Sequence, residues 1–433
     1  MGTRYTLDGM ISVEEALSAV LDLVEHQPLE LVELANSMGR VLARDVLSDL
    51  DIAPFAHSAM DGFALRCVDV NGPAPDASGP APDAAAPLRV VGLLAAGSVF
   101  DGTLQPGEAL RIMTGAPMPA GADAVVRIED CAVIGEGPAC PAGREVSVLT
   151  RPAPGDNVRP SGEEARAGDI IMRAGERIGL AAVGLLASTG NAVVEVYGRP
   201  RVTVLSTGSE LVDATAVPGP GQIRDSNTPA LCAAAADAGA FAVAMPLVPD
   251  TAEGLRAALE AAVRTSDFVV LSGGAAEGDF DYTGAVIREM GVVLFSKVNM
   301  RPGKAQTLGL VGGVPVFGLP GNPVAAAVGF ELLVRPALRK MQGHTALERP
   351  RVTARLAADV TKRERRRMYL RGTCRRDEHG QLSAIPAQNQ SSALYSVMHA
   401  SNCLIVVPEG AAPLAAGEAV ECVCVNLPEG EVL

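Results

Sequence analysis

The chain has 433 residues, of which 48% are hydrophobic, 20% are charged and only 3% are aromatic. This length exceeds what a single core supports, so we expect several globular domains. The 36 Lys and Arg residues against 50 Asp and Glu residues give a formal net charge of −14. Such a field repels nucleic acid phosphates, which argues against general nucleic acid binding.

Neither membrane insertion nor a disulfide framework is indicated. No apolar run reaches the roughly 20 residues that cross a bilayer, and the first residues lack the apolar core of a signal peptide. We therefore expect a soluble, cytoplasmic protein without membrane contact. The eight cysteines show neither zinc-site nor redox CxxC spacing, and we interpret them as reduced core thiols at positions 67, 131, 140, 232, 374, 403, 422 and 424.

The first predicted element is an amphipathic helix over residues 11–25, with Ser12 as its N-cap and Glu15 completing a capping box. A small β domain follows, because short apolar stretches separated by Pro and Gly occur at residues 88–94, 109–113, 124–128 and 145–149. Residues 71–87 are rich in Pro, Ala, Gly and Asp and predict a flexible surface loop. Residues 156–198, with a helix expected at 180–188, would complete the first domain around this β insertion.

Strands and helices alternate clearly from Arg199 onward. A β-branched run at residues 199–208 precedes an Ala-rich helix with Thr228 as its cap and Pro229 in its first turn. The alternation continues to a helix that begins at Pro323. Because the strands are almost continuously apolar, they predict a parallel sheet covered on both faces, which is a doubly wound α/β domain.

The predicted architecture is therefore multidomain α/β. Residues 1–50 and 156–198 would form an α+β first domain, residues 51–155 the inserted β domain, and residues 199–345 the doubly wound domain. In residues 346–433 the helical pattern disappears. Short alternating strands at 351–356, 403–407 and 419–425 predict a small β-barrel or sandwich there.

Four strand ends of the doubly wound domain carry Gly-rich or polar turns. Ligands bind beyond the carboxyl ends of such strands, and glycines let backbone N–H groups approach an anion closely. Any one of these turns could be ordinary strand-to-helix punctuation, but four on one edge favour a binding site. The turns contain Ser206, Thr207, Gly208, Ser209 and Glu210; Asp250; Ser272, Gly273 and Gly274; and Leu319, Pro320, Gly321 and Asn322.

Carboxylates and cations accompany these turns. Carboxylates repel a phosphate ester unless a cation such as Mg²⁺ lies between them, so the pattern predicts a metal-assisted phosphoryl or nucleotidyl site. The three aspartates could instead cap the helices that follow them. Neither a Walker A sequence nor GxGxxG is present, which disfavours P-loop and dinucleotide binding. The residues are Glu210, Asp250, Asp279 and Asp281, with Lys297, Arg301 and Lys304.

Polar segments outside this domain are open to two interpretations. Ser58 and Asp61 lie in a predicted turn ahead of a strand, and Thr114 lies at a strand end; by spacing alone both are turns, with Asp61 as an Asx-type turn former. The loop at residues 155–169, with Arg159 and Glu163, fits a solvated charged loop. The basic stretch at residues 362–367 could dock a partner, guide an anionic substrate, or be a solvated strand edge.

Six segments occur in an order and spacing that resemble one enzyme family. SAMDGFALR, RIMTGAPMPAGADAVV, GDNVRPSGEE, VTVLSTGSELV, DFDYT and GLPGNPV are similar to segments of the molybdopterin molybdenumtransferases, bacterial relatives of the gephyrin E domain. The resemblance runs from about Ile11 to the C-terminus. It implies an elongated first domain, a C-terminal β-barrel, and a homodimer whose active site lies between the doubly wound domain of one subunit and the inserted-domain region of the other.

The resemblance also implies the chemistry. Adenylated molybdopterin and molybdate would be the substrates, Mg²⁺ would assist, AMP would leave, and the pterin dithiolene would hold the molybdenum in the last step of cofactor synthesis. Molybdopterin adenylyltransferase and molybdoenzyme chaperones are the protein partners to expect. Implied catalytic residues are Asp61, Thr114 and Asp281, and implied metal contacts are Glu210, Asp250 and Asp281. Implied substrate contacts are Ser58, Ser206, Thr207, Gly208, Glu210, Ser272, Gly273, Gly274, Lys297, Arg301, Lys304, Pro320, Gly321 and Asn322.

The chain departs from the family pattern at several positions. Where the family commonly has GGVS, Ala275 and Ala276 follow the two glycines; Glu164 replaces an Asp, Ala325 a Ser, and Arg301 a Lys. Arginine keeps the charge but binds oxyanions as a planar fork. Lower activity, an altered oxyanion preference and a paralogue with a modified role are therefore open.

Two other functions share features of this sequence. An adenylyltransferase or nucleotide pyrophosphatase could share the doubly wound domain, but such enzymes lack the segments around Asp61 and Thr114. A dimeric peptide anchor of the gephyrin kind is the alternative outside catalysis. Four carboxylates together, Asp61, Glu210, Asp250 and Asp281, favour an enzyme over an anchor.

Overall fold

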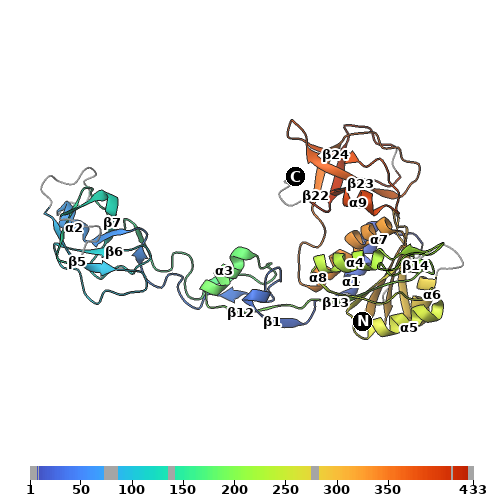
Figure 1. Cartoon of the computed structure of the whole chain (residues 1–433), viewed down its shortest axis with the longest axis horizontal. Coiled ribbons are helices and arrows are strands. Elements are labelled where there is room, and N and C mark those ends of the chain that lie inside the picture. The colour runs from blue at the N-terminus through green and yellow to red at the C-terminus, as the bar shows by residue number, and fades with distance from the viewer. Residues whose placement is uncertain are drawn as a thin grey trace.

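The computed structural model describes residues 7, 9–72, 86–134, 142–274, 282–410 and 413–427. In these ranges the molecule is long, with a β domain at one end and the α/β and C-terminal domains at the other (Figure 1). No helix in the described ranges is both long and apolar enough to cross a membrane. Several predictions fall outside them, namely those on residues 73–85, Cys140, Ala275, Ala276, Asp279 and Asp281.

The inserted β domain is a six-stranded sheet in the order β7-β4-β6-β5-β9-β8. Its core contains Phe63 and Leu65 from β4 and Val90 from β5. Each predicted apolar stretch forms a strand, with ends that differ by at most a residue, whereas β8 was not predicted. The strands are β4 (Gly62–Leu65), β5 (Leu88–Leu94), β6 (Glu108–Ile112), β7 (Ala124–Arg127), β8 (Cys131–Ile134) and β9 (Glu145–Val148), with the short helix α2 (Cys67–Asn71).

A thin middle section connects the two ends of the molecule (Figure 1). It consists of two-stranded antiparallel ladders that pair β1 with β12, β2 with β11 and β3 with β10. Leu42, Ile178 and Leu186 form its small core. The helix α3 (Leu180–Ser188) has the predicted bounds. The strands are β1 (Leu29–Glu33), β2 (Val46–Leu47), β3 (His57–Ser58), β10 (Val158–Arg159), β11 (Ile170–Met172) and β12 (Val193–Tyr197), with the 3-10 turn η1 (Leu34–Asn36).

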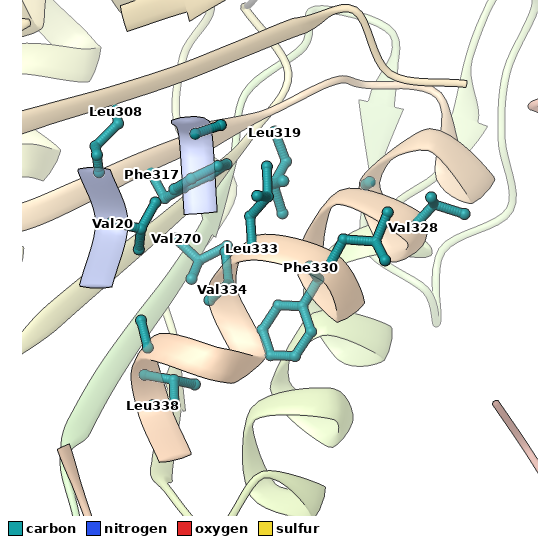
Figure 2. Close-up of a cluster of buried hydrophobic side chains, with 14 of the residues drawn as sticks. Val20, Val270, Leu308, Phe317, Leu319, Val328, Phe330, Leu333, Val334 and Leu338 are labelled. Carbon is teal, nitrogen blue, oxygen red and sulfur yellow. The ribbon is translucent and has the colours of Figure 1, made fainter. Parts of the chain in front are cut away.

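The first helix, α1 (Val13–Leu23), has the predicted capping box: Glu15 N donates to Ser12 Oγ at 3.2 Å, and Ser12 N donates to the Glu15 carboxylate at 2.8 Å. Its apolar face packs on the α/β domain, where Val20 lies in one cluster with Phe317 and Leu333 (Figure 2). The assignment of residues 1–50 to the first domain is therefore wrong for α1. Burying its apolar stripe requires a large partner surface, which the thin middle section does not offer.

The α/β domain contains a six-stranded sheet in the order β16-β13-β17-β21-β20-β18. The first four strands are parallel, as predicted, but β20 and β18 are antiparallel to their neighbours. A tight turn at Gly312 and Gly313 joins β20 to β21, and so short a connection only permits an antiparallel pair. The strands are β13 (Arg201–Ser206), β16 (Phe241–Ala244), β17 (Phe268–Ser272), β18 (Gly291–Lys297), β20 (Ala305–Val311) and β21 (Val314–Leu319).

Helices cover both faces of this sheet. On one face, α1 and α4 pack with the continuous segment formed by α7, η3 and α8, and Phe330 and Leu338 are fully buried there (Figure 2). On the other face, α5 and α6 bury Leu259 and Ile287. The helices are α4 (Asn227–Asp237), α5 (Ala252–Val263), α6 (Tyr282–Met290), α7 (Pro323–Gly329), η3 (Phe330–Val334) and α8 (Arg335–Met341). A small parallel ladder pairs β14 (Leu211–Val212) with β15 (Ile223–Arg224).

Thr228 is not the cap of α4, contrary to prediction. The helix begins two residues earlier, with Ser226 as N-cap, and Asp225 Oδ1 accepts hydrogen bonds from the N–H groups of Asn227 and Thr228. The Thr228 hydroxyl is instead buried against Ser206 Oγ at 2.7 Å. Asp225, which directly precedes Ser226, therefore caps the first N–H groups of the helix.

The C-terminal domain is a closed five-stranded β-barrel, because β23 pairs with both β24 and β25 in the order β23-β24-β22-β26-β25. The short β19 (Met300–Arg301) adds to β23 and connects the barrel to the α/β domain. A short helix, α9 (Tyr395–His399), interrupts the strands, so the prediction that helix is absent here is wrong. The strands are β22 (Arg351–Leu356), β23 (Arg367–Arg376), β24 (Leu382–Pro386), β25 (Cys403–Val407) and β26 (Ala419–Cys424).

The seven described cysteines are free thiols, as predicted. Five of them are buried, and four of those five lie in the barrel. Cys131 and Cys232 are only partly buried. Burial raises the pKa of Cys67 and of Cys131 to about 12, which keeps both thiols protonated at neutral pH.

Candidate functional site

A cavity of about 1250 Å³ lies between the carboxyl edge of the α/β sheet and the C-terminal barrel. All four predicted strand-end turns line it, so thirteen of the predicted site residues come together. These are Ser206, Thr207, Gly208, Glu210, Asp250, Ser272, Gly273, Gly274, Arg301, Lys304, Pro320, Gly321 and Asn322. Lys297 lies at the end of β18 and is not among the lining residues.

Strand order explains why the cavity forms here. β13 pairs with β16 on one side and with β17 on the other, and the chain reaches these neighbours through connections on opposite faces of the sheet. The connections diverge at this point and leave a crevice beyond the strand ends. Thr207 follows β13 and Gly273 follows β17, so both turns open into that crevice.

Gly273 allows the two turns to touch. Its φ is +95°, and a Cβ added there would lie 2.1 Å from the Thr207 carbonyl oxygen. Only glycine fits both the backbone conformation and the contact. The close approach brings the backbone of the β13 and β17 turns to one wall of the cavity.

A buried hydrogen-bond network holds the turns in register. Asn227 Nδ2 donates to Ser272 Oγ at 2.7 Å and to the Gly321 carbonyl at 2.9 Å. The Tyr395 hydroxyl of the barrel lies 3.5 Å from Asn227 Oδ1. Burial, followed by the charge of Asp225, raises the pKa of Tyr395 to about 12, so the phenol remains a donor. Asn227 was not predicted as a site residue.

Asp250 is held by a side chain and does not cap the following helix. Its Oδ1 accepts a hydrogen bond from the Thr207 hydroxyl at 3.0 Å, whereas Thr251 is the N-cap of α5 and accepts from Gly254 N. The capping alternative for Asp250 is therefore wrong. Since a threonine directly before the helix satisfies its first N–H groups, the carboxylate is left to face the cavity.

The cavity carries four described carboxylates, those of Glu210, Asp225, Asp250 and Asp359. Across the described ranges, no three His, Cys, Asp or Glu side chains are close enough together to form a metal-binding group. Glu210 and Asp250 nonetheless line one cavity. Mg²⁺ in phosphate-binding sites is commonly held by one or two carboxylates plus substrate oxygens, so this donor set fits a metal of that kind.

Cations from two domains line the same cavity, and only some of them could be predicted from the sequence. Arg301 and Lys304 were predicted; Arg363 and Arg366 come from the basic stretch whose role was left open. Arg224 and Arg371 were missed. Arg371 could have been recognised from the sequence, because it follows the apolar residues at the start of β23 and charged side chains are rarely buried unless they are paired.

Arg371 is a buried cation without a carboxylate partner among the described residues. It is 1% exposed; its guanidinium donates to the Tyr369 and Ser391 carbonyls, and its Nε has no hydrogen-bond partner in the described part of the chain. Burial and then the charge of Arg301 lower its pKa to about 10, so it is still protonated at neutral pH. A buried positive charge of this kind favours an anionic ligand.

The three predicted residues Ser58, Asp61 and Thr114 do not line the cavity. Asp61 accepts hydrogen bonds from Thr114 N and Thr114 Oγ1, both at 2.8 Å, and these bonds hold the pKa of Asp61 below its ordinary value. Its interpretation as a simple Asx turn is therefore wrong; Ser58 is the turn former, since its hydroxyl donates to the Met60 carbonyl at 2.6 Å.

Within one chain these residues lie far from the cavity. Asp61 directly precedes β4 in the inserted sheet, at the opposite end of the long molecule from the α/β domain (Figure 1). The loop with Glu163 and Glu164 is exposed, and Arg159 and Glu163 form an ion pair at 3.2 Å, as a solvated loop predicts. One chain alone therefore does not bring Ser58, Asp61 and Thr114 to the predicted site.

Comparison with known proteins gives matches along nearly the whole chain. Three family models match in order: the MoeA N-terminal region (domain I and II) at residues 11–190, a probable molybdopterin binding domain at 203–340, and the MoeA C-terminal region (domain IV) at 353–424. A molybdopterin molybdenumtransferase of Staphylococcus aureus is 34% identical over 413 residues, covering 95% of this chain and 94% of the relative.

Two further relatives agree. Molybdopterin molybdenumtransferase 1 of Mycobacterium tuberculosis is 36% identical over 429 residues, covering 95% of this chain and 98% of the relative. The crystal structure of the molybdopterin biosynthesis MoeA protein from Pyrococcus horikosii superimposes with a TM-score of 0.79 at 33% identity, covering 96% of this chain and 99% of that one.

Proposed function

The chain belongs to the molybdopterin molybdenumtransferases, enzymes of molybdenum cofactor biosynthesis, and we propose that it inserts molybdenum into an adenylated molybdopterin with release of AMP. One observation carries the proposal: carboxylates and cations line one large cavity at the switch point of the α/β sheet. This combination suits a cavity that binds a ligand with a phosphoanhydride and a second, oxyanionic ligand beside it. A simple phosphate site would need no carboxylates.

The cations divide the cavity into two walls. Arg224 and Lys304 come from the α/β domain, and Arg301, Arg363, Arg366 and Arg371 lie on the barrel side, since the β19 strand of Arg301 pairs with β23. Guanidinium groups bind tetrahedral oxyanions through paired N–H donors. We assign the barrel wall to molybdate, because the buried charge of Arg371 has no carboxylate partner among the described residues, and the sheet wall to the phosphates of the nucleotide.

Glu210 and Asp250 would hold a Mg²⁺ ion against the phosphate oxygens, with Asp281 as a further contact. The ion would neutralise phosphate charge while the anhydride bond breaks. Thr207 fixes the Asp250 carboxylate through its hydroxyl, and Asn227 keeps the two flanking turns in place. The pterin dithiolene, not the protein, would bind molybdenum, which agrees with the absence of a cysteine cluster from the lining residues.

A second copy of the chain would complete the site. The middle section exposes large apolar side chains, with Leu31 72% and Leu180 80% exposed, and such surfaces mark association sites. In a two-fold dimer, Asp61 and Thr114 of one subunit would face the cavity of the other. The ionised, doubly hydrogen-bonded Asp61 would there orient water or metal during the cleavage.

An AMP-release assay tests the proposal. Purified protein with adenylated molybdopterin, molybdate and Mg²⁺ is expected to release AMP and to yield a cofactor that activates an apo-molybdoenzyme. Asp250→Asn should lower AMP release at least about tenfold, whereas Asp213→Asn, at an exposed carboxylate outside the cavity lining, should not. If the unmodified protein released no AMP, the proposed function would be wrong.

A further inference from the structure

Glu364 of the barrel holds two arginines of the cavity wall at once. Arg301 Nη1 donates to Glu364 Oε1 at 2.8 Å, and Arg366 Nε donates to Glu364 Oε2 at 2.7 Å. Arg301 comes from β19 and Arg366 from the segment before β23, so the carboxylate links two different elements. Both arginines line the cavity, whereas Glu364 is not among the lining residues.

The Glu364 carboxylate is ionised at neutral pH. Its side chain is 20% exposed, and burial alone would favour the protonated form. Hydrogen bonds from Arg301 and Arg366, however, hold its pKa below the ordinary value. The two guanidinium groups are therefore already partly neutralised before any ligand enters.

An oxyanion in the cavity would need the same N–H groups. A carboxylate and a tetrahedral oxyanion bind a guanidinium group through the same pair of N–H donors. One arginine therefore cannot form both pairs of hydrogen bonds at the same time. The Arg301 side chain is 53% exposed, which leaves it room to turn from Glu364 toward the cavity. Ion pairs this accessible to solvent are weak, so a ligand can displace the carboxylate.

We propose that Glu364 is a specificity-determining residue that competes with bound oxyanion for Arg301 and Arg366. It weakens the binding of a free oxyanion, so that tight binding requires the larger charge of the nucleotide-linked substrate. This inference rests on the proposed function only in taking the cavity as the place where anions bind. Arg371 has no such competitor among the described residues and therefore provides the permanent charge.

Direct binding of sodium molybdate tests the proposal without turnover. We expect Glu364→Gln to bind molybdate about three- to tenfold more tightly than the unmodified protein in calorimetric titration at low ionic strength. Glu421→Gln is the matched control: it also breaks a barrel ion pair, with Arg351 at 2.6 Å, but neither residue lines the cavity. Its molybdate affinity should be unchanged. Local damage to the fold would weaken binding, so a gain in affinity cannot arise from it.

A double variant locates the effect. Adding Arg301→Gln to Glu364→Gln should remove most of the gain in molybdate affinity, because the guanidinium group that Glu364 no longer holds is then absent. Unchanged or weaker molybdate binding in Glu364→Gln would overturn the inference, as would the absence of molybdate binding by both proteins. If Glu364→Gln bound molybdate more tightly as expected while the unmodified protein released no AMP, the proposed function would be wrong and the competition by Glu364 would still be supported.

Discussion

Asn227 and Ser272 are joined by a 2.7 Å hydrogen bond that ties the first turn of α4 to the end of β17. The same amide reaches the Gly321 carbonyl, so a single side chain fixes the spacing of two cavity turns. Ser272 is the last residue of β17, whereas Gly321 lies outside regular secondary structure. The geometry of the cavity therefore depends on a buried side chain that itself need not contact the substrate.

Asn227→Ala should lower both stability and substrate affinity. The substitution removes the amide donor of the Gly321 carbonyl and one of the two hydrogen bonds of the Ser272 hydroxyl, which still donates to the Pro320 carbonyl. An unsatisfied buried group costs about 1–3 kcal/mol. We expect a lower melting temperature and weaker AMP binding in titration calorimetry. Asn191→Ala removes comparable amide hydrogen bonds in the middle section and should leave AMP affinity intact. Equal loss of affinity in both variants would show that Asn227 has no special role.

Gly273→Ala should damage the cavity far more than a similar change elsewhere. Its Cβ would collide with the Thr207 carbonyl at 2.1 Å, and its φ of +95° disfavours any side chain. Gly221→Ala has a comparable φ of +77° but open space around the new Cβ. We expect Gly221→Ala to cost about 1 kcal/mol and Gly273→Ala to abolish AMP binding. Retained AMP binding in Gly273→Ala would mean that the two turns need not touch.

Arg371→Met should weaken molybdate binding without lowering the stability of the protein. Arg371 is a buried charge without a carboxylate partner among the described residues, and such a charge costs free energy, so the melting temperature should stay level or rise. Molybdate affinity should fall about tenfold or more, because the buried charge is lost. Arg371→Lys keeps the charge and should retain part of the binding. If Arg371→Met bound molybdate normally, the barrel wall would not be the oxyanion site.

His344 should make the protein less stable in mild acid. Burial and the charges of Arg339, Arg177 and Arg335 lower its pKa to about 4. The folded state then keeps His344 neutral while the unfolded state takes up a proton below about pH 6.5, so stability falls as pH drops from 6.5 toward 4.

The comparison with His344→Gln measures this effect. Between pH 7.5 and 5, the unmodified protein should lose about 1–2 kcal/mol more than the variant, after allowance for solvent screening. Urea unfolding at each pH gives the difference, and His379→Gln, at an exposed histidine, serves as the control. Parallel stability curves for the unmodified protein and His344→Gln would contradict the assigned burial.

Local patterns in the sequence predicted most of the elements. Short apolar stretches located the strands of the inserted domain other than β8, a helical repeat located α1, and the four polar strand ends were correctly brought to one cavity. The strand β20 was not predicted, and the antiparallel direction of β18 and β20 was missed because apolar residues do not reveal the direction of a strand. Arg371 was missed because its position depends on how the barrel packs over the sheet, which no local pattern records.

The residues of the inserted domain are a second case in which local sequence patterns do not record how distant parts of the protein are arranged. Asp61 and Thr114 could be singled out from their segments, and their mutual hydrogen bonds lie within one sheet. Their proposed relation to the cavity would require a second chain, and a single sequence carries no information about the distance between residues of two chains. The assignment of α1 failed for a related reason, since only tertiary packing decides which domain buries its apolar face.

Complementation between two inactive variants tests the shared site most directly. Asp61→Ala and Asp250→Asn proteins are each expected to release little AMP alone. After unfolding and refolding together, mixed dimers should contain one intact site, which restores about a quarter of the unmodified activity when half the dimers are mixed. Absence of recovery, with mixed dimers demonstrated by mass spectrometry, would contradict a site built from two chains.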